Sequence, residues 1–314
     1  MKTTRAFALR FWLCAIAAAL ACVLALPPRG GAPRPPFPLS MEAYLSSYRG
    51  ESADHYLFGL GILGFGQRMR NAELLVFGSS HAQLGLSAAQ LGKRAFNAGL
   101  GYGEGIAFFR DIVDRNDLSG KALLVDIYNW RGDGVSDIAA SVRQAGPVQG
   151  YVRVGKTWGR AVSDWLLDGF MPCAEYREGG FASVRCVDWL MLRRWEDGDM
   201  QEWWSPTLGL LYRDVPPALT RRFAAEAARE APADFAGPFG RAFPPAFLAQ
   251  RALKPTLTLV PYPAGDATWA AAQAQALGLP FAPIAPEGLE FTADRHHLTA
   301  AGRAEATRRL RLHR

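Results

Sequence analysis

The chain has 314 residues, of which 49% are hydrophobic and 20% charged, with a net charge of +6 and a pI near 9.3. This length allows one large domain or two smaller ones, and the apolar content excludes a mostly disordered chain. The positive charge gathers near the two ends, and no basic stripe with interleaved aromatic residues is present. These features argue against a nucleic-acid-binding protein.

The N-terminus predicts a membrane anchor over residues 1–26. Within residues 6–26 Arg10 is the only charged residue. A helix of this length measures roughly 30 Å and crosses the hydrocarbon core if Arg10 extends to the headgroups. Lys2 and Arg5 precede the segment. The positive-inside rule therefore puts the N-terminus in the cytoplasm and the later residues on the periplasmic side of the inner membrane.

Two alternatives to an uncleaved anchor stay open. Ala19-Leu20-Ala21 resembles the cleavage site of a signal peptide, although apolar residues continue beyond it to Leu26. A lipoprotein cysteine at Cys22 is a weaker alternative. Residues 27–40, rich in proline and glycine, predict a stiff linker to a folded domain at 41–314.

The domain predicts an α/β fold. Residues 41–72 have a helical pattern with a break at their glycines, and apolar runs then alternate with helical segments. Such runs are typical of a parallel sheet covered on both faces, and we expect a three-layer sandwich with flavodoxin-like topology. The expected strands are residues 72–78, 95–99, 121–130, 255–263 and, weakly, 280–286; the expected helices are 87–94, 105–116, 267–278 and 299–312.

The middle section, about 131–250, interrupts this alternation and predicts a helical insertion or cap. It has helical patterns at 150–170 and 218–231, and it contains six tryptophans. These tryptophans serve either as core and cap packing or as a groove that stacks against sugar rings. Cys173 and Cys186 flank a polar, glycine-containing stretch. In an exported domain that spacing favours a disulfide, with two free thiols as the alternative.

The residues at the strand ends predict a catalytic site. Gly78-Ser79-Ser80 follows the first sheet strand, and Asp294 and His297 precede the last helix. Loops at the carboxyl ends of parallel strands meet at one edge, so these distant residues can come together. A serine nucleophile needs a base to take its proton, and the base needs a carboxylate to orient it.

These motifs resemble the SGNH, or GDSL-type, hydrolase superfamily. "VFGSSHA" occupies the place of the first block, "FNAGLGYG" is similar to the second, and "ADRHHLTAAG" is similar to the last. The resemblance covers roughly residues 73–130 and 255–310. It implies Ser80 as nucleophile, His297 as base, Asp294 as the orienting acid, and the N–H of Gly99 as an oxyanion donor.

The third block departs from the family pattern. Asn129 aligns with the asparagine that completes the oxyanion hole, but the neighbouring glycine and aspartate are missing. Loss of one such donor costs about 3–4 kcal/mol in other enzymes. Asp126, on the preceding strand, is either a buried polar anchor or a fallback acid.

Three other histidines, His296, His81 and His55, are weaker candidates for the base. His296 adjoins His297 but lacks the spacing of the family's catalytic histidine. His81 directly follows Ser80, and a structural role at the helix start is favoured for it. His55 has no partner in the sequence. No cluster has metal-ligand spacing and no phosphate-binding glycine loop is present, so no metal or cofactor is expected.

Together with the expected anchor and the tryptophans, the resemblance implies a membrane-anchored O-acetyltransferase or esterase. Its expected substrate is an acyl-ester or an envelope or exported polysaccharide, and its expected partners are membrane proteins of a polysaccharide assembly. Related membrane-attached proteins move acyl groups onto or off such polymers. An SGNH-like subunit without turnover and a plain secreted esterase are the alternatives.

Overall fold

The computed structural model describes residues 43–48, 51–92, 94–100, 104, 106–128, 135–168, 190–205, 209–210, 245–262, 265, 267–291 and 297–312, with Cys14 and Ala17. The expected anchor at 1–26 and linker at 27–40 lie outside these residues, apart from those two positions. Within the described ranges, no helix combines the length and apolar character needed to cross a bilayer.

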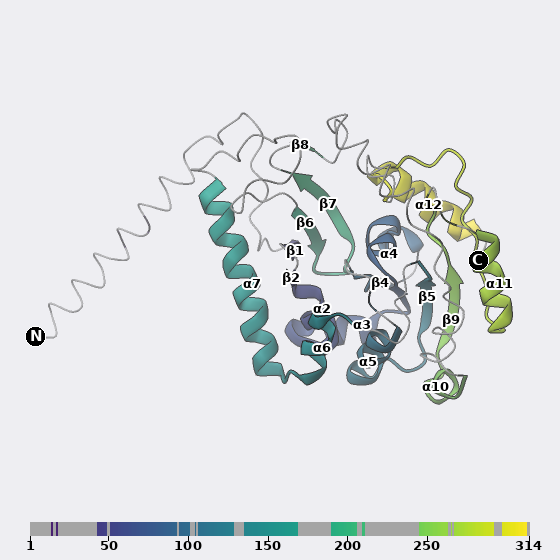
Figure 1. Cartoon of the computed structure of the whole chain (residues 1–314), viewed down its shortest axis with the longest axis horizontal. Coiled ribbons are helices and arrows are strands. Elements are labelled where there is room, and N and C mark those ends of the chain that lie inside the picture. The colour runs from purple at the N-terminus through teal and green to yellow at the C-terminus, as the bar shows by residue number, and fades with distance from the viewer. Residues whose placement is uncertain are drawn as a thin grey trace, which may run out of the picture.

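A parallel four-stranded sheet forms the centre of the fold (Figure 1). The strands lie in the order β4-β3-β5-β9, and an isolated parallel bridge from Leu257 to Phe281 extends the sheet beyond β9. This confirms the predicted α/β class, and the weak fifth strand is reduced to that bridge. The strand bounds are Leu74–Phe77 for β3, Ala95–Asn97 for β4, Ala122–Asp126 for β5 and Lys254–Thr258 for β9.

Helices follow these strands at nearly the predicted places. The segment expected to be one short helix at 87–94 is a single 3-10 turn, and a separate short helix begins at Ser80. The bounds are Ser80–Gly85 for α4, Ala89–Leu91 for η2, Ile106–Asn116 for α5, Pro245–Gln250 for α10, Ala267–Ala276 for α11 and Ala300–Leu312 for α12.

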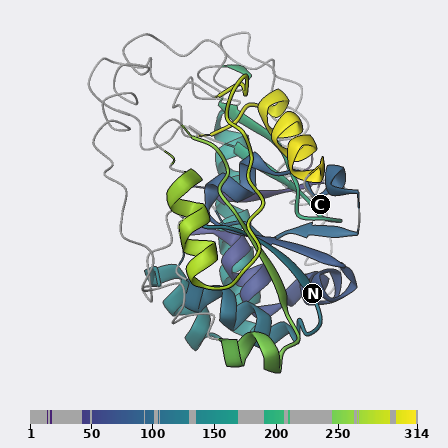
Figure 2. The same cartoon turned by 90° about the vertical axis from the view of Figure 1, so that its right-hand side faces the viewer.

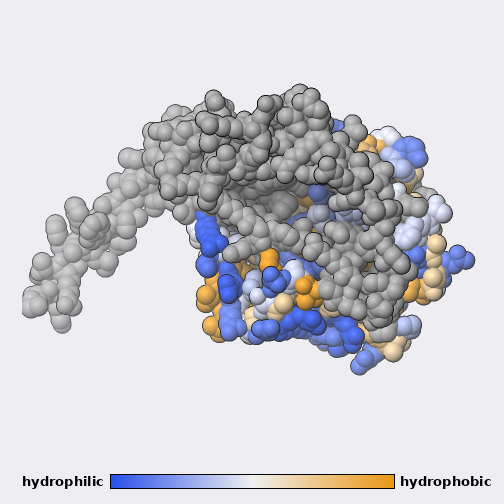
Figure 3. Space-filling view, viewed as in Figure 1, coloured by the Kyte–Doolittle hydropathy of each residue, from blue (hydrophilic) through white to orange (hydrophobic). Residues whose placement is uncertain are grey.

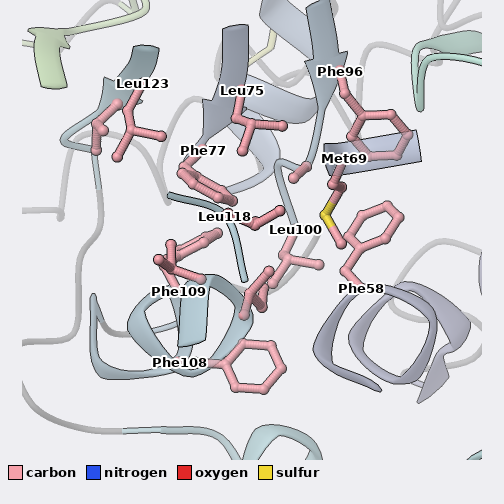
Figure 4. Packing of buried hydrophobic residues seen from close by; sticks show 14 of the residues in the cluster. Phe58, Met69, Leu75, Phe77, Phe96, Leu100, Phe108, Phe109, Leu118 and Leu123 are labelled. Atoms are coloured by element: carbon pink, nitrogen blue, oxygen red, sulfur yellow. The ribbon is translucent and has the colours of Figure 1, made fainter. Parts of the chain in front are cut away.

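Helices pack against both faces of the parallel sheet. Successive strand residues point to opposite faces, so Leu75 and Phe77 join one apolar cluster while Leu74 and Val76 join another. The larger cluster includes side chains of α5 and α11. Figure 4 shows Phe77 of β3 close to Phe109 of α5 in this cluster, with ring centroids 5.0 Å apart. The smaller cluster includes side chains of α4 and α12. Figure 2 shows α11 and α12 on opposite sides of the strands.

A second, antiparallel sheet corrects two predictions. Residues 43–48, expected to be helical, form a strand, and the middle section contributes strands as well as helices. The sheet order is β2-β1-β6-β7-β8. Its bounds are Ala43–Tyr48 for β1, Glu51–Ser52 for β2, Leu190–Arg194 for β6, Met200–Ser205 for β7 and Gly209–Leu210 for β8.

Of the remaining helices, α2 and α7 contact strand β1 of this second sheet, and α6 packs against α2. The expected helix near 150–170 is confirmed as the long helix α7, while the one expected at 218–231 lies outside the described residues. Their bounds are Ala53–Leu60 for α2, Ile62–Gly64 for η1, Phe65–Asn71 for α3, Asp137–Gln144 for α6 and Pro147–Asp168 for α7. Most of the described surface in Figure 3 is hydrophilic, with small apolar areas between.

The turn between β6 and β7 packs against the edge strand of the parallel sheet. The N–H of Asn97 donates to the carbonyl of Asp197 at 2.8 Å, so the open edge of β4 gains a partner. Asp199 accepts hydrogen bonds from the N–H of Ala88 at 2.7 Å and from the hydroxyl of Ser87 at 2.6 Å. The turn of the middle section is thereby joined to the carboxyl end of β4 and to the connection between α4 and η2.

Two of the six tryptophans of the middle section serve as packing. Trp158 and Trp195 lie edge to face with ring centroids 5.6 Å apart, and Trp195 stacks on Phe65 at the same separation. Both indoles are partly buried against the larger apolar cluster. The side chains of the other four tryptophans lie outside the described part of the chain.

Candidate active site

Five side chains or backbone groups collect at the carboxyl edge of the parallel sheet. Ser80 follows β3, Gly99 follows β4, Tyr128 follows β5, Tyr262 follows β9, and His297 precedes α12. This is the edge at which ligands bind in open α/β sheets. The topology therefore places the predicted serine and histidine on the same side of the molecule.

The turn between β3 and α4 presents Ser80 at the first position of the helix. Gly78 has φ of 151°, a conformation that favours glycine. Ser79 caps the helix, because its Oγ accepts the N–H of His81 at 3.3 Å. The cap role thus belongs to Ser79, while the hydroxyl of the half-buried Ser80 makes a different contact.

That contact is with the predicted base. The Nε2 atom of His297 lies 3.0 Å from the Oγ of Ser80, across a separation of 217 residues. This is hydrogen-bonding distance for a nucleophile and its base. The loop that carries His297 is held by Leu298, which is buried and forms a bridge with Phe291, and by the N–H of Thr299, which donates to the carbonyl of Glu290.

An aromatic cluster lies beside this pair. The buried ring of His81 stacks on Tyr128 with centroids 3.6 Å apart and meets Tyr262 edge to face at 5.1 Å. The centroid of the His297 ring is 5.2 Å from that of His81. His81 therefore packs the wall of the site, as favoured from the sequence. Sequence reasoning missed the two tyrosines, because both lie inside the predicted strands at 121–130 and 255–263. The structure ends β5 at Asp126 and β9 at Thr258, so both tyrosines fall in the loops that follow.

Gly99 is held tightly by its neighbours. A Cβ on Gly99 would lie 2.6 Å from the backbone N of Gln83, so only glycine lets this loop approach α4. Its N–H donates to the Oδ1 of Asn97 at 3.0 Å. The N–H of Gly99, the expected oxyanion donor, is thus already bonded to Asn97 in its own loop. To stabilise an oxyanion, this N–H would have to share or release its hydrogen bond to Asn97.

Asp126 is an anchor between strand ends. Its fully buried carboxyl accepts the N–H of Val260 at 2.8 Å and is also hydrogen-bonded by the N–H of Tyr128. Burial raises the pKa of this carboxyl from 3.8 to about 7, against the opposing effect of the two hydrogen bonds. These contacts favour the structural role over that of a fallback acid.

His55 has a partner that the sequence did not indicate. Its Nε2 lies 2.7 Å from the Oε1 of Glu104, and both side chains are fully buried. Glu104 also accepts the N–H of Ser136, at the start of α6, at 3.0 Å. The pair ties the chain after Gly99 to α2 and α6.

The other predicted site residues lie outside the described ranges. These residues are Asp294, His296, Asn129, Cys173 and Cys186. Among the residues that are described, no group of three or more histidine, cysteine, aspartate or glutamate side chains has a metal-binding arrangement.

Comparisons of the chain with family models, with curated proteins and with solved structures found no match.

Proposed function

We propose that this chain is a membrane-anchored, extracytoplasmic serine acyl-ester enzyme, an O-acetyltransferase or esterase of SGNH type. The observation that carries the proposal is the contact between Ser80 Oγ and His297 Nε2. The strand order, with helices on both faces, supports a three-layer sandwich of flavodoxin-like topology, which the resemblance implies.

The reaction follows from this pair of residues. Ser80 Oγ attacks the ester carbonyl while its proton passes to His297 Nε2. The tetrahedral intermediate then collapses: the bond to the leaving alcohol breaks, and that alcohol takes the proton from His297. Water or a sugar hydroxyl next attacks the acyl-serine, gives its proton to His297, and releases Ser80, which recovers that proton.

The supporting groups are assigned by the resemblance. Asp294 orients His297, and Gly99 and Asn129 contribute to the oxyanion hole. The N–H of Ser80 is a further donor, because the first N–H groups of a helix have no partner within that helix. Donors of this kind act by stabilising the negative oxygen of the tetrahedral intermediate.

The substrate class rests on the sequence. The N-terminal segment and linker favour a domain held near an envelope, and the resemblance favours an O-acylated polysaccharide there. A sugar-stacking role for Trp158 and Trp195 is disfavoured, since both pack against other aromatic rings.

One observation favours a second candidate, an SGNH-like subunit without turnover that organises a polysaccharide-modifying membrane assembly. The hydrogen bond from Gly99 N–H to Asn97 engages the donor that the chemistry needs. The sequence around Asn129, which lacks the glycine and aspartate of the family's third block, also favours this candidate.

A labelling experiment separates the two candidates. The full-length chain, purified in detergent, is treated with a fluorophosphonate probe and separately with p-nitrophenyl acetate. The enzyme proposal expects labelling and hydrolysis that disappear in Ser80→Ala and His297→Ala. Ser79→Ala is the matched control: it loses a helix cap but keeps the nucleophile, so labelling should persist. Equal labelling of the wild type, Ser80→Ala and His297→Ala would leave the inactive subunit as the better description.

A further inference from the structure

Arg193 is a buried cation that the catalytic assignment does not use. It lies on β6, within the middle section, and its side chain has no exposed surface. Its Nε lies 2.9 Å from the Oδ2 of Asp54, whose side chain is equally buried. The guanidinium also lies over the ring of Phe58, 5.1 Å from its centroid.

The other guanidinium nitrogens bind the loop that contains Gly99. Nη1 donates to the carbonyl of Asn97 at 2.6 Å and to that of Gly198 at 2.8 Å, and Nη2 donates to the carbonyl of Gly99. One planar cation thus fixes two peptide groups of the loop, a geometry that the multiple donors of arginine allow and those of lysine do not.

This loop in turn holds the helix that carries Ser80. The Nδ2 of Asn97 donates to the carbonyls of Ala82 and Leu86, at 3.2 and 3.0 Å. Gly99 lies against the backbone of Gln83, as the close approach of its hypothetical Cβ shows. The Nε2 of Gln83 also reaches the Oδ2 of Asp54 at 3.5 Å. A displacement of the loop would therefore be transmitted to α4.

We infer that Arg193 is a positioning residue for the acyl-transfer site: with Asp54, it holds the loop around Gly99 against α4 and so places Ser80 opposite His297. The inference rests on the proposed function for its catalytic consequence. By this inference the middle section helps to position the catalytic residues through Arg193, in addition to any role as a cap.

Two variants test the inference, so that it stays testable if one of them fails to fold. Arg193→Lys keeps a cation beside Asp54 but loses the fork of donors. The double variant Asp54→Asn/Arg193→Met removes both charges, so neither is left buried alone. Arg251→Met is the matched control, because Arg251 pairs with Asp114 at 2.9 Å and its carbonyl accepts the N–H of Gly120 just before β5, at the opposite edge.

The first readout is kinetic, on the full-length chain. Thermal melting first identifies a temperature at which every variant is folded. At that temperature we expect the rate of fluorophosphonate labelling to fall at least tenfold in both test variants and to be unchanged in Arg251→Met. With p-nitrophenyl acetate, kcat should fall while KM stays within about twofold. Folded test variants that label at the wild-type rate would overturn the inference.

The second readout does not require activity. Hydrogen exchange should accelerate in the peptides covering residues 80–86 and 95–100 of both test variants, and should stay unchanged in those covering β9 and α11. Exchange at the wild-type rate in the first two peptides would refute the role of Arg193 in holding the loop around Gly99 against α4. If the wild type fails to react with the probe, the enzyme proposal fails, and the exchange result alone decides whether Arg193 holds the loop.

Discussion

Gly78 lies so close to Ala82 that a side chain on Gly78 has no room: its Cβ would fall 2.6 Å from the Cβ of Ala82. It would also lie 2.9 Å from the Cβ of Asp126. Both contacts arise because α4 begins immediately after β3 and folds back over the end of β5. The turn that presents Ser80 therefore depends on glycine for its space as well as for its positive φ.

Gly78→Ala should destabilise the fold by about 2 kcal/mol or more, since it adds backbone strain to a steric clash. Urea unfolding at pH 7 measures the change. Gly155→Ala is the control, because this glycine lies in α7 with nothing within 4 Å of the added Cβ. There alanine should be neutral or stabilising by up to about 1 kcal/mol. Equal stabilities for the two variants would contradict the close packing at Gly78.

Asn97→Asp should destabilise the protein although it preserves the side-chain shape. The buried Nδ2 of Asn97 donates to three carbonyls, those of Ala82, Gln83 and Leu86. An aspartate would put a carboxylate oxygen against them, with a cost of about 3 kcal/mol. Urea unfolding measures it, with the exposed Asn71→Asp as control, since Asn71 acts only as an acceptor for Gln67 in its hydrogen bond. A loss below about 1 kcal/mol in Asn97→Asp would count against this network.

Glu104→Gln should destabilise the fold in a pH-dependent way. Burial raises the pKa of Glu104, but the hydrogen bond and charge of His55 and the hydrogen bonds of Ser136 outweigh it, so the pKa lies below its ordinary value of 4.5. A lowered carboxyl pKa stabilises the folded state above the unfolded pKa, and this contribution is lost as pH falls.

We therefore expect the variant to lose about 1–3 kcal/mol at pH 7, and the difference from wild type to shrink below about pH 4.5. Denaturant unfolding between pH 3.5 and 7 measures both. A difference that stays constant over this range would show that the ionised Glu104 contributes nothing specific.

The sequence predicted the parallel sheet because its strands are buried on both faces and appear as continuous apolar runs. It did not predict the antiparallel sheet. Tyr44 pairs with Arg193, and this pairing is far from local along the chain. Neither β1 nor β6 has the uninterrupted apolar character of a central strand. The pattern of residues 41–72 instead predicted helix, interrupted only at the glycines near 59–66.

The contact between Ser80 and His297 was predictable for two reasons. Ser80 follows a clearly patterned strand and His297 precedes a clearly patterned helix, and a serine nucleophile requires a base such as histidine. Arg193 was not, because it stands beside Arg194 in the sequence and the two residues look alike. Neighbouring residues of a strand face opposite sides. Arg193 is consequently buried with Asp54, while Arg194 pairs with Asp197 at the turn. Only the pairing of β6 decides which arginine turns inward.

Asp126 gives the protein a stability that declines with rising pH. Its folded pKa of about 7 lies above the unfolded value of 3.8, so between these values the folded state retains a proton that the unfolded chain has released. The free energy of unfolding then decreases as pH rises through this window, by up to about 1.4 kcal/mol per pH unit, and levels off above it.

Asp126→Asn should remove this decline while its Oδ1 still accepts the N–H of Val260. The stability of the variant relative to wild type is expected to increase from pH 5 to pH 7 and to stay constant from pH 7.5 to 8.5. Urea unfolding across this range measures it, with the exposed Asp117→Asn as the control for the exchange of carboxyl for amide. A relative stability independent of pH would mean that Asp126 is ionised in the folded state throughout, stabilised by its backbone donors despite its burial.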